Sequence, residues 1–172
     1  MANKTIDVIK SRVSCRTYSD KKVSIKKLEM ILDAGKSAPS AMNRQIADIT
    51  AVRKSSYVSK LRELSLKLSN RDVMYGAGTI ILVHAPREDA FCIQDSTCII
   101  ENLMVAAAAL KIDSCWINQF DELLSAPEAK RIRKALGIPD DHRIVGSVAL
   151  GYRKEGAVIE VKNKTNINVV IK

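Results

Sequence analysis

The chain has 172 residues, of which 47% are hydrophobic and 27% are charged, and its formal net charge is +9. This composition is typical of a globular protein and excludes intrinsic disorder, and the length fits one domain with a substantial core. The N-terminal residues lack the apolar core of a signal peptide, and no apolar run approaches the roughly 20 residues that cross a bilayer. We therefore expect a cytoplasmic protein with no membrane partner.

The positive charge suits nucleic acid, an acidic surface or a phosphorylated small molecule as the partner. The basic residues are scattered along the sequence, and aromatic residues make up only 4% of it, too few for a base-stacking platform. We therefore expect no nucleic-acid partner, and a basic nucleic-acid-binding module is kept as the alternative that the charge itself suggests.

Cysteine and histidine residues are few and widely spaced: Cys15, Cys92, Cys98, Cys115, His84 and His142. No C-x-x-C pair occurs, and the spacing matches no known zinc-binding pattern. We expect structural cysteines kept reduced in a reducing compartment, structural histidines and no metal site.

The first half of the chain shows four regular patterns. Helical spacing of apolar residues covers 5–12, where Thr5 is a candidate N-cap, and Ser24 begins an amphipathic helix over 24–36. After a turn at Pro39, a short strand is expected at 46–53. A helix is expected at 55–69, with an apolar stripe formed by Val58, Leu61, Leu64 and Leu68.

The second half alternates buried strands with helices. In chain order we expect a strand at 79–85, a long and almost wholly apolar helix at 89–111, a strand at 112–118, a helix at 125–137 and a strand at 143–151. Ser125 and Glu128 fit a capping box for the helix at 125–137, and Gly137 fits its C-terminal end. Helices interleaved with a short sheet predict a single α/β or α+β domain over residues 1–172.

Three polar stretches are candidates for a binding site. If the first helix continued, Arg12 and Arg16 would share one face, an arrangement that suits a phosphate monoester as well as a solvated helix end. Residues 37–45 offer hydroxyl and amide groups that suit a heterocycle, or form an ordinary loop. Lys162 and Lys164 alternate in extended chain and point the same way, as in a solvated tail.

Taken together, these stretches resemble the FMN-dependent nitroreductase family. The likeness rests on R-x-S-x-R at 12–16, A-P-S-x-x-N-x-Q at 38–45, S-N-R-D at 69–72, W-I-N-Q at 116–119, G-Y-R at 151–153 and the terminal K-x-K. The resemblance covers essentially the whole chain. It implies an α+β fold with three α/β/α layers, in which helices flank a mixed or antiparallel central sheet. It also implies a homodimer in which the extension 152–172 of each chain reaches the other subunit.

The resemblance implies that one group of residues holds the phosphate and ribityl chain of FMN. These residues are Arg12, Val13 through its backbone, Ser14, Arg16, Lys162 and Lys164. The interpretation makes Cys15, which lies between the two arginines, a bystander.

A second group is implied at the isoalloxazine ring. The partner subunit would contribute Pro39, Ser40, Ala41 and Asn43. Asn70 would bond the pyrimidine side of the ring, and the segment behind the ring would consist of Trp116, Ile117, Asn118 and Gln119.

The implied function is an FMN-dependent NAD(P)H oxidoreductase. Its ping-pong cycle takes a hydride from NADH or NADPH through flavin N5 to an electron-poor small-molecule acceptor, and no catalytic side chain is implied because the cofactor carries the chemistry. The chain departs from the family's usual Q-P-W, having Gln45, Ile46 and Ala47, and it lacks the long helical insertion of larger relatives. An FMN-binding protein that stores, senses or consumes flavin without reductase turnover is the alternative.

Overall fold

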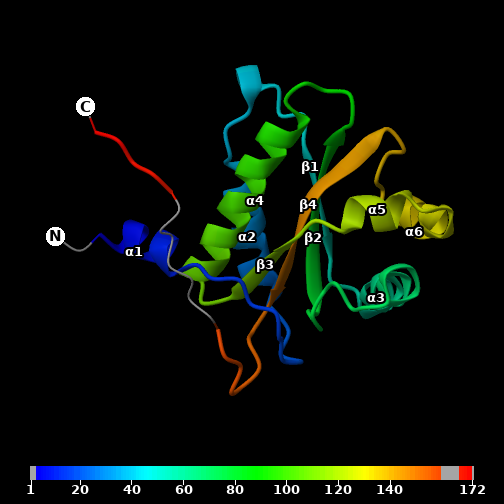
Figure 1. Ribbon diagram of the computed structural model, residues 1–172, viewed down its shortest axis with the longest axis horizontal. Coiled ribbons are helices and arrows are strands. Elements are labelled where there is room, and N and C mark those ends of the chain that lie inside the picture. Colours follow the sequence, from blue (N-terminus) through cyan, green and yellow to red (C-terminus); the bar gives the residue numbers. More distant parts are fainter. Residues whose placement is uncertain (1–2, 160–166, 172) are drawn as a thin grey trace.

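In the computed structural model, which describes residues 3–159 and 167–171, a four-stranded sheet lies between two layers of helices (Figure 1). The strands are β1 (Asp48–Val52), β2 (Thr79–Pro86), β3 (Asp113–Ile117) and β4 (His142–Gly151). Their order is β1-β2-β4-β3, and all neighbouring pairs are antiparallel. An isolated parallel bridge joins Ser14 to Ser114 of β3. The expected mixed or antiparallel sheet is therefore confirmed.

Helices cover both faces of the sheet. They are α1 (Lys4–Ser11), α2 (Ile25–Lys36), α3 (Ser55–Ser69), α4 (Cys92–Ala109), α5 (Phe120–Ser125) and α6 (Lys130–Ala135), with short 3₁₀ helices η1 (Ala41–Asn43) and η2 (Pro127–Ala129). Figure 1 shows α2 and α4 on one face and α3, α5 and α6 on the other, which confirms the three-layer α/β/α fold. Among the helices so described, none has both the length and the apolar character of a membrane span.

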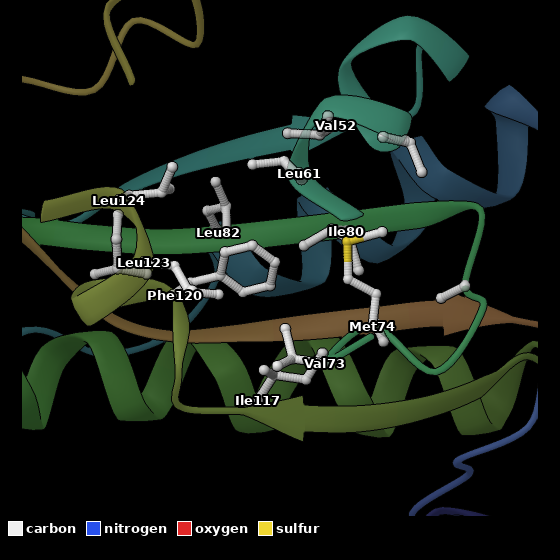
Figure 2. Packing of buried hydrophobic residues seen from close by; sticks show 14 of the residues in the cluster. Val52, Leu61, Val73, Met74, Ile80, Leu82, Ile117, Phe120, Leu123 and Leu124 are labelled. Atoms are coloured by element: carbon white, nitrogen blue, oxygen red, sulfur yellow. The ribbon is translucent and has the colours of Figure 1, made fainter. Parts of the chain in front are cut away.

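Two buried clusters hold the layers together because side chains alternate between the faces of β2. Ile81 and Val83 pack with α2 and α4 in one cluster, and Ile80 and Leu82 pack with α3 and α5 in the other. Phe120, the first residue of α5, lies over this second face of β2 (Figure 2). The core therefore forms on both sides of one sheet.

Several local predictions are confirmed. The Ser24 hydroxyl accepts a hydrogen bond of 3.3 Å from the N–H of Lys27 and caps α2. The helix expected at 55–69 has those bounds. Gly137 follows α6 with a φ of +71°, the left-handed conformation that glycine adopts most readily at a helix end.

Other local predictions are wrong. The N-cap of the first helix is Asn3 instead of Thr5, since the Asn3 side chain accepts a hydrogen bond of 3.0 Å from the N–H of Thr5. The helix ends at Ser11, and Arg12 is extended, so Arg12 does not share a helix face with Arg16. Leu68 is 38% exposed and does not join the buried face of α3.

The helix expected at 125–137 is also corrected. Ser125 ends α5, no side-chain capping bond forms there, and the chain continues through η2 into α6. Ala126 is extended, with a ψ of 145°, which the following Pro127 favours by restricting the residue before it. The helix α5 at 120–125 was not expected, and it forms because Phe120, Leu123 and Leu124 are buried against the sheet.

Candidate functional site

The segment that follows α1 runs beside the edge strand β3. Arg12 leaves the helix with φ −62° and ψ 123°, and Ser14 pairs in parallel with Ser114. The N–H of Cys15 donates a hydrogen bond of 2.9 Å to the carbonyl of Ser114. The segment R-V-S-C-R is therefore anchored as extended chain along β3, and this pairing sets the positions of its side chains.

Arg12 lies at a hollow of about 380 Å³ between the end of α4 and β3, whose lining also includes Val13, Lys111 and Ser114. Its Nη1 atom is buried and has no hydrogen-bond partner within the described parts of the chain. A buried guanidinium N–H without an acceptor is costly, so the atom is suited to an anionic oxygen from a ligand. Arg12 therefore fits the phosphate role that its position in the sequence implied.

Two neighbouring side chains in the hollow neutralise each other. The carboxylate of Asp113 accepts hydrogen bonds of 3.0 Å from Nε and 2.6 Å from Nη2 of Arg153. Burial raises the pKa of the Cys115 thiol, and the positive charges of Arg16 and Arg12 act on that pKa in the opposite direction. The guanidinium groups of Arg12 and Arg16 are therefore close enough to Cys115 to affect its pKa, while Asp113 is paired with Arg153.

Cys15 has a structural environment. The side chain is 1% exposed, and its thiol donates a hydrogen bond of 3.3 Å to the carbonyl of Thr17. Burial raises the pKa of this thiol, which keeps it protonated at neutral pH. These features agree with its interpretation as a bystander between the two arginines.

The residues implied behind the flavin ring lie at the other end of β3 and just beyond it. Trp116 and Ile117 end the strand, Asn118 follows, and Gln119 is the N-cap residue of α5. The indole Nε1 of Trp116 donates a hydrogen bond to the side-chain oxygen of Asn118, and the carbonyl of Ile117 accepts one of 2.9 Å from Ser147. This end of β3 is therefore held in one conformation.

Asn70 ends α3 in the left-handed conformation, with φ 54° and ψ 25°, and its N–H bonds the carbonyl of Leu66 at 3.0 Å. Asparagine tolerates this conformation better than most residues do. Asn70 itself is exposed. Val73 and Met74, which follow it, pack in one cluster with Ile117 (Figure 2). The segment after α3 therefore packs against the last residue of β3.

The loop that carries Pro39, Ser40, Ala41 and Asn43 has a defined internal structure. The Ser40 hydroxyl accepts a hydrogen bond of 3.1 Å from the N–H of Gln45, whose side-chain amide donates one of 3.1 Å to Asn43. Positive φ values of 53° to 54° occur at three residues of this loop: Met42, Asn43 and Gln45. Met42 and Gln45 adopt this conformation less readily than Asn43 does, and such backbone in residues other than glycine is concentrated at functional sites, so the loop is a binding candidate.

Two anchors that the sequence analysis missed hold this loop against α4 and the turn before it. The N–H of Ala41 donates a hydrogen bond of 3.0 Å to the buried carboxylate of Asp95. Arg44 pairs with Asp89 through two hydrogen bonds of 2.9 Å each. The available signal was Asp95 itself, an acidic residue in the helix expected at 89–111.

The structure does not bring the loop to the arginines within one chain. Asp95, which holds the loop, lies near the start of α4, whereas Ala108 lines the hollow of Arg12 near the helix end. At about 1.5 Å per residue, the helix between Asp95 and Ala108 spans roughly 20 Å. Figure 1 shows η1 and α1 at opposite ends of α4. Lys162 and Lys164 lie outside the described residues.

Comparison with known proteins matches both the sequence and the fold of this chain. Residues 9–68 and 51–152 match the family model of the Nitroreductase family. The chain belongs to the nitroreductase family. A protein of Archaeoglobus fulgidus, provisionally named NADH dehydrogenase/NAD(P)H nitroreductase, is 31% identical over 155 residues, covering 87% of this chain and 86% of the relative.

Solved nitroreductase structures also share the fold. The nitroreductase of Bacteroides fragilis with bound FMN has a TM-score of 0.89 and 32% identity, over 99% of this chain and 100% of that one. The nitroreductase of Desulfitobacterium hafniense, also with bound FMN, has a TM-score of 0.85 and 26% identity over the same shares. These comparisons confirm the family and the nitroreductase fold that the sequence resemblance implied.

Proposed function

We propose that this nitroreductase-family chain is an FMN-dependent NAD(P)H oxidoreductase acting on an electron-poor small molecule. The observation that carries the proposal is the buried Nη1 of Arg12, which has no acceptor within the described residues. It lies in a hollow beside the N-terminal R-V-S-C-R segment, where an anionic group would complete its hydrogen bonding. The FMN bound in the two similar structures supplies an anion of that chemistry.

In this proposal the residues along β3 bind FMN at two ends. Arg12, Ser14 and Arg16 would hold the phosphate, with Lys162 and Lys164 as the expected further contacts. Guanidinium groups are suited to this task because they present several N–H donors in one plane. At the other end, the backbone and side chains of Trp116–Gln119 would lie behind the ring.

The cofactor, when bound, would supply ping-pong hydride transfer from NADH or NADPH to the acceptor. The chain's own contribution is orientation and electrostatics. The bond from Trp116 to Asn118 and the bond from Ser147 to Ile117 keep the end of β3 rigid, and a rigid support maintains the distance between reacting groups. The positive groups near the N-terminal segment would favour an anionic flavin.

We further propose a homodimer of single-domain chains. The roughly 20 Å between the two ends of the candidate site along α4 supports this, because a second subunit would bring its own 39–43 loop to the first subunit's ring site. Helix α1 buries no residue, and Ile6 and Ile9 are 54% and 51% exposed. Val169 and Val170 of the C-terminal segment are also mostly exposed, which supports an extension, 152–172, that packs on a partner copy.

A cytoplasmic setting would be compatible with this chemistry. The cysteines at 15, 92, 98 and 115 are all free thiols in the structure, the state that a reducing compartment maintains. We propose that the protein works there with NADH or NADPH as the hydride donor and without a nucleic-acid partner.

The test is the visible absorption spectrum of the purified protein, taken before and after anaerobic addition of NADH and, separately, NADPH. A flavin spectrum that bleaches, and recovers when an electron-poor acceptor such as a quinone is added, is the expected result. A flavin spectrum that neither nucleotide bleaches would overturn the reductase proposal and favour a protein that stores, senses or consumes FMN. A protein that refuses added FMN would overturn the cofactor assignment.

The dimer is tested separately by light scattering at micromolar concentration. The expected mass is twice that of the 19.0 kDa chain. A monomer that nevertheless binds FMN tightly would overturn the shared site, because the 39–43 loop would then have no route to the ring.

A further inference from the structure

Three side chains that are far apart in the sequence meet at one end of the sheet. Asp48 of β1 lies opposite His84 of β2, and His142 of β4 lies opposite Pro86 of β2. The Nδ1 atoms of the two histidines are 2.9 Å apart, and Oδ2 of Asp48 is 3.9 Å from Nδ1 of His142. One ligand atom from each residue lies within 4.8 Å of the others.

The orientation of the His84 ring is set by Thr50 of the neighbouring strand β1. Its Nε2 atom is 3.1 Å from the hydroxyl oxygen of Thr50. When Nε2 carries the proton and donates to that hydroxyl, Nδ1 presents a lone pair toward Nδ1 of His142. Nδ1 of His142 can donate an N–H to that lone pair at 2.9 Å, or, with its own proton on Nε2, present a second lone pair that a cation between the two rings would satisfy. A hydrogen bond from the far ring nitrogen is the usual support of a metal-binding histidine.

The surroundings allow a cation to enter and be held. His84 and His142 are 2% and 8% exposed, whereas the Asp48 side chain is 65% exposed and opens the cluster to solvent. A neutral imidazole is the form in which histidine binds metals.

Arg133 is the positive group that opposes a cation here. Its Nη2 donates hydrogen bonds of 2.6 Å to the carbonyls of Pro139 and His142, and its Nη1 donates one of 3.4 Å to that of Leu124. These bonds hold the guanidinium group against backbone carbonyls. The negative charge of Asp48 counteracts the repulsion between Arg133 and a cation bound in the cluster.

We propose that Asp48, His84 and His142 bind one first-row divalent transition-metal ion, such as Zn²⁺, through two imidazole Nδ1 atoms and one carboxylate oxygen. A tetrahedral zinc ion needs ligand atoms roughly 3.3 Å apart. The separations of 2.9 Å and 3.9 Å bracket that value, so binding would need a slight widening between the two imidazole rings and a small rotation of the exposed Asp48, with water as the fourth ligand. The ion would join β1, β2 and β4.

This site is independent of the proposed FMN function, because its three ligands are outside the set of predicted cofactor residues. It departs from the expectation of no metal site. That expectation rested on sequence spacing, and the three residues are adjacent only through the register of three strands.

The experiment uses the full-length, untagged protein, with whatever flavin it carries after purification, once metal has been removed by a chelator. Zn²⁺ is titrated in competition with a chromophoric chelator, and Co²⁺ is followed by its visible d–d bands in a difference spectrum. We expect one ion per chain and a cobalt spectrum without thiolate charge transfer. We also expect a rise in Tm of about 5 °C when free Zn²⁺ is roughly one hundred times Kd.

The variant Asp48→Asn removes one ligand at an exposed position, and Asp20→Asn is the matched control at another exposed aspartate. We expect D48N to lose about tenfold or more in affinity and D20N to bind like the wild type. Equal affinity in D48N and D20N, a thiolate signature with cobalt, or no stoichiometric binding by the wild type would each overturn the proposal. Far-UV circular dichroism of each variant shows that it has folded.

Discussion

The backbone N–H of Ala41 donates a hydrogen bond of 3.0 Å to Oδ1 of Asp95, a carboxylate that is only 5% exposed inside α4. This bond holds the loop that contains Ala41 against helix α4. The partner atom Oδ2 is buried without a hydrogen bond among the described residues. Burying a polar atom without a partner costs free energy, and the hydrogen bond from Ala41 to the other oxygen offsets part of that cost.

Replacing Asp95 should separate the hydrogen bond from the charge. Asp95→Ala leaves the N–H of Ala41 without its acceptor and should lower the free energy of unfolding by ~1–3 kcal/mol. Asp95→Asn keeps a carbonyl oxygen at the same place and should lower it less. Urea unfolding of both variants measures the difference. Equal stability of D95A and D95N would show that the contact with Ala41 does not hold the loop.

Arg12 should contribute to FMN affinity through its buried guanidinium. A hydrogen bond to a charged group contributes about 1.5–3 kcal/mol, so Arg12→Gln should weaken FMN binding roughly tenfold to hundredfold. Arg131→Gln, at an exposed arginine of α6, is the control and should leave affinity unchanged. Fluorescence titration of the apoprotein with FMN gives both values. A stable R12Q protein with wild-type affinity would remove Arg12 from the site.

The C-terminal lysines should act on the same phosphate. A double variant, Lys162→Ala with Lys164→Ala, should weaken FMN binding, and the loss should shrink as salt is added because screening reduces long-range charge attraction. The matched control changes Lys130 and Lys134, two exposed lysines of α6, to alanine. If both double variants changed affinity by the same factor, only the net charge of the chain would be acting.

Gly146 should be required for the position of Trp116. A Cβ at residue 146 would lie 2.9 Å from the indole Nε1 and 2.8 Å from Cδ1 of Ile100, inside the packed core. Gly146→Ala should therefore lower the free energy of unfolding by ~1–3 kcal/mol and shift the fluorescence of Trp116, the single tryptophan. Gly78→Ala meets nothing within 4 Å and is the control. An unchanged spectrum in G146A would mean that the indole keeps its place and that Gly146 is not required for it.

Stability should fall at alkaline pH. Burial raises the pKa of the Cys15, Cys92 and Cys115 thiols above the ordinary value of 9.0. The folded state therefore keeps protons that the unfolded state releases above pH 9, so this contribution is fully present below pH 9 and is lost as the pH rises. Each thiol then lowers the unfolding free energy by at most ~1.4 kcal/mol per pH unit.

Urea unfolding at pH 8 and pH 10 tests this linkage. Cys115→Ser removes one titrating thiol from the core and should reduce the loss of stability between the two pH values. Cys98→Ser, at the exposed cysteine, is the control and should leave that loss unchanged. A loss that is the same in C115S and in the wild type would assign the alkaline effect to other groups.

The sequence predicts most elements of this fold because their signals are local. The apolar spacing over 55–69 marks α3 from end to end, and Ser24 marks the start of α2. The helix α5 was missed for a different reason. Phe120, Leu123 and Leu124 have helical spacing, but the segment is too short to be stable by itself, and its burial against the sheet is what makes it form.

The candidate site divides in the same way. The residue types in R-V-S-C-R and around Asn43 and Trp116, together with their order along the chain, indicate the nitroreductase family without any structure. The structure alone shows that Arg12 carries a buried donor without a partner and that Asp95 holds the loop. These facts depend on packing between segments, which a linear pattern does not contain.

By itself, the sequence determined the types and approximate positions of the helices and strands and the chemistry of the segments proposed to bind FMN, because helical and strand periodicity and residue chemistry act over short distances. Only the tertiary structure decided which distant residues meet. It put His84 beside His142 and placed the 39–43 loop at the end of α4 remote from Arg12. Strand order, register and the length of α4 set those distances, and each is a property of the packed chain as a whole.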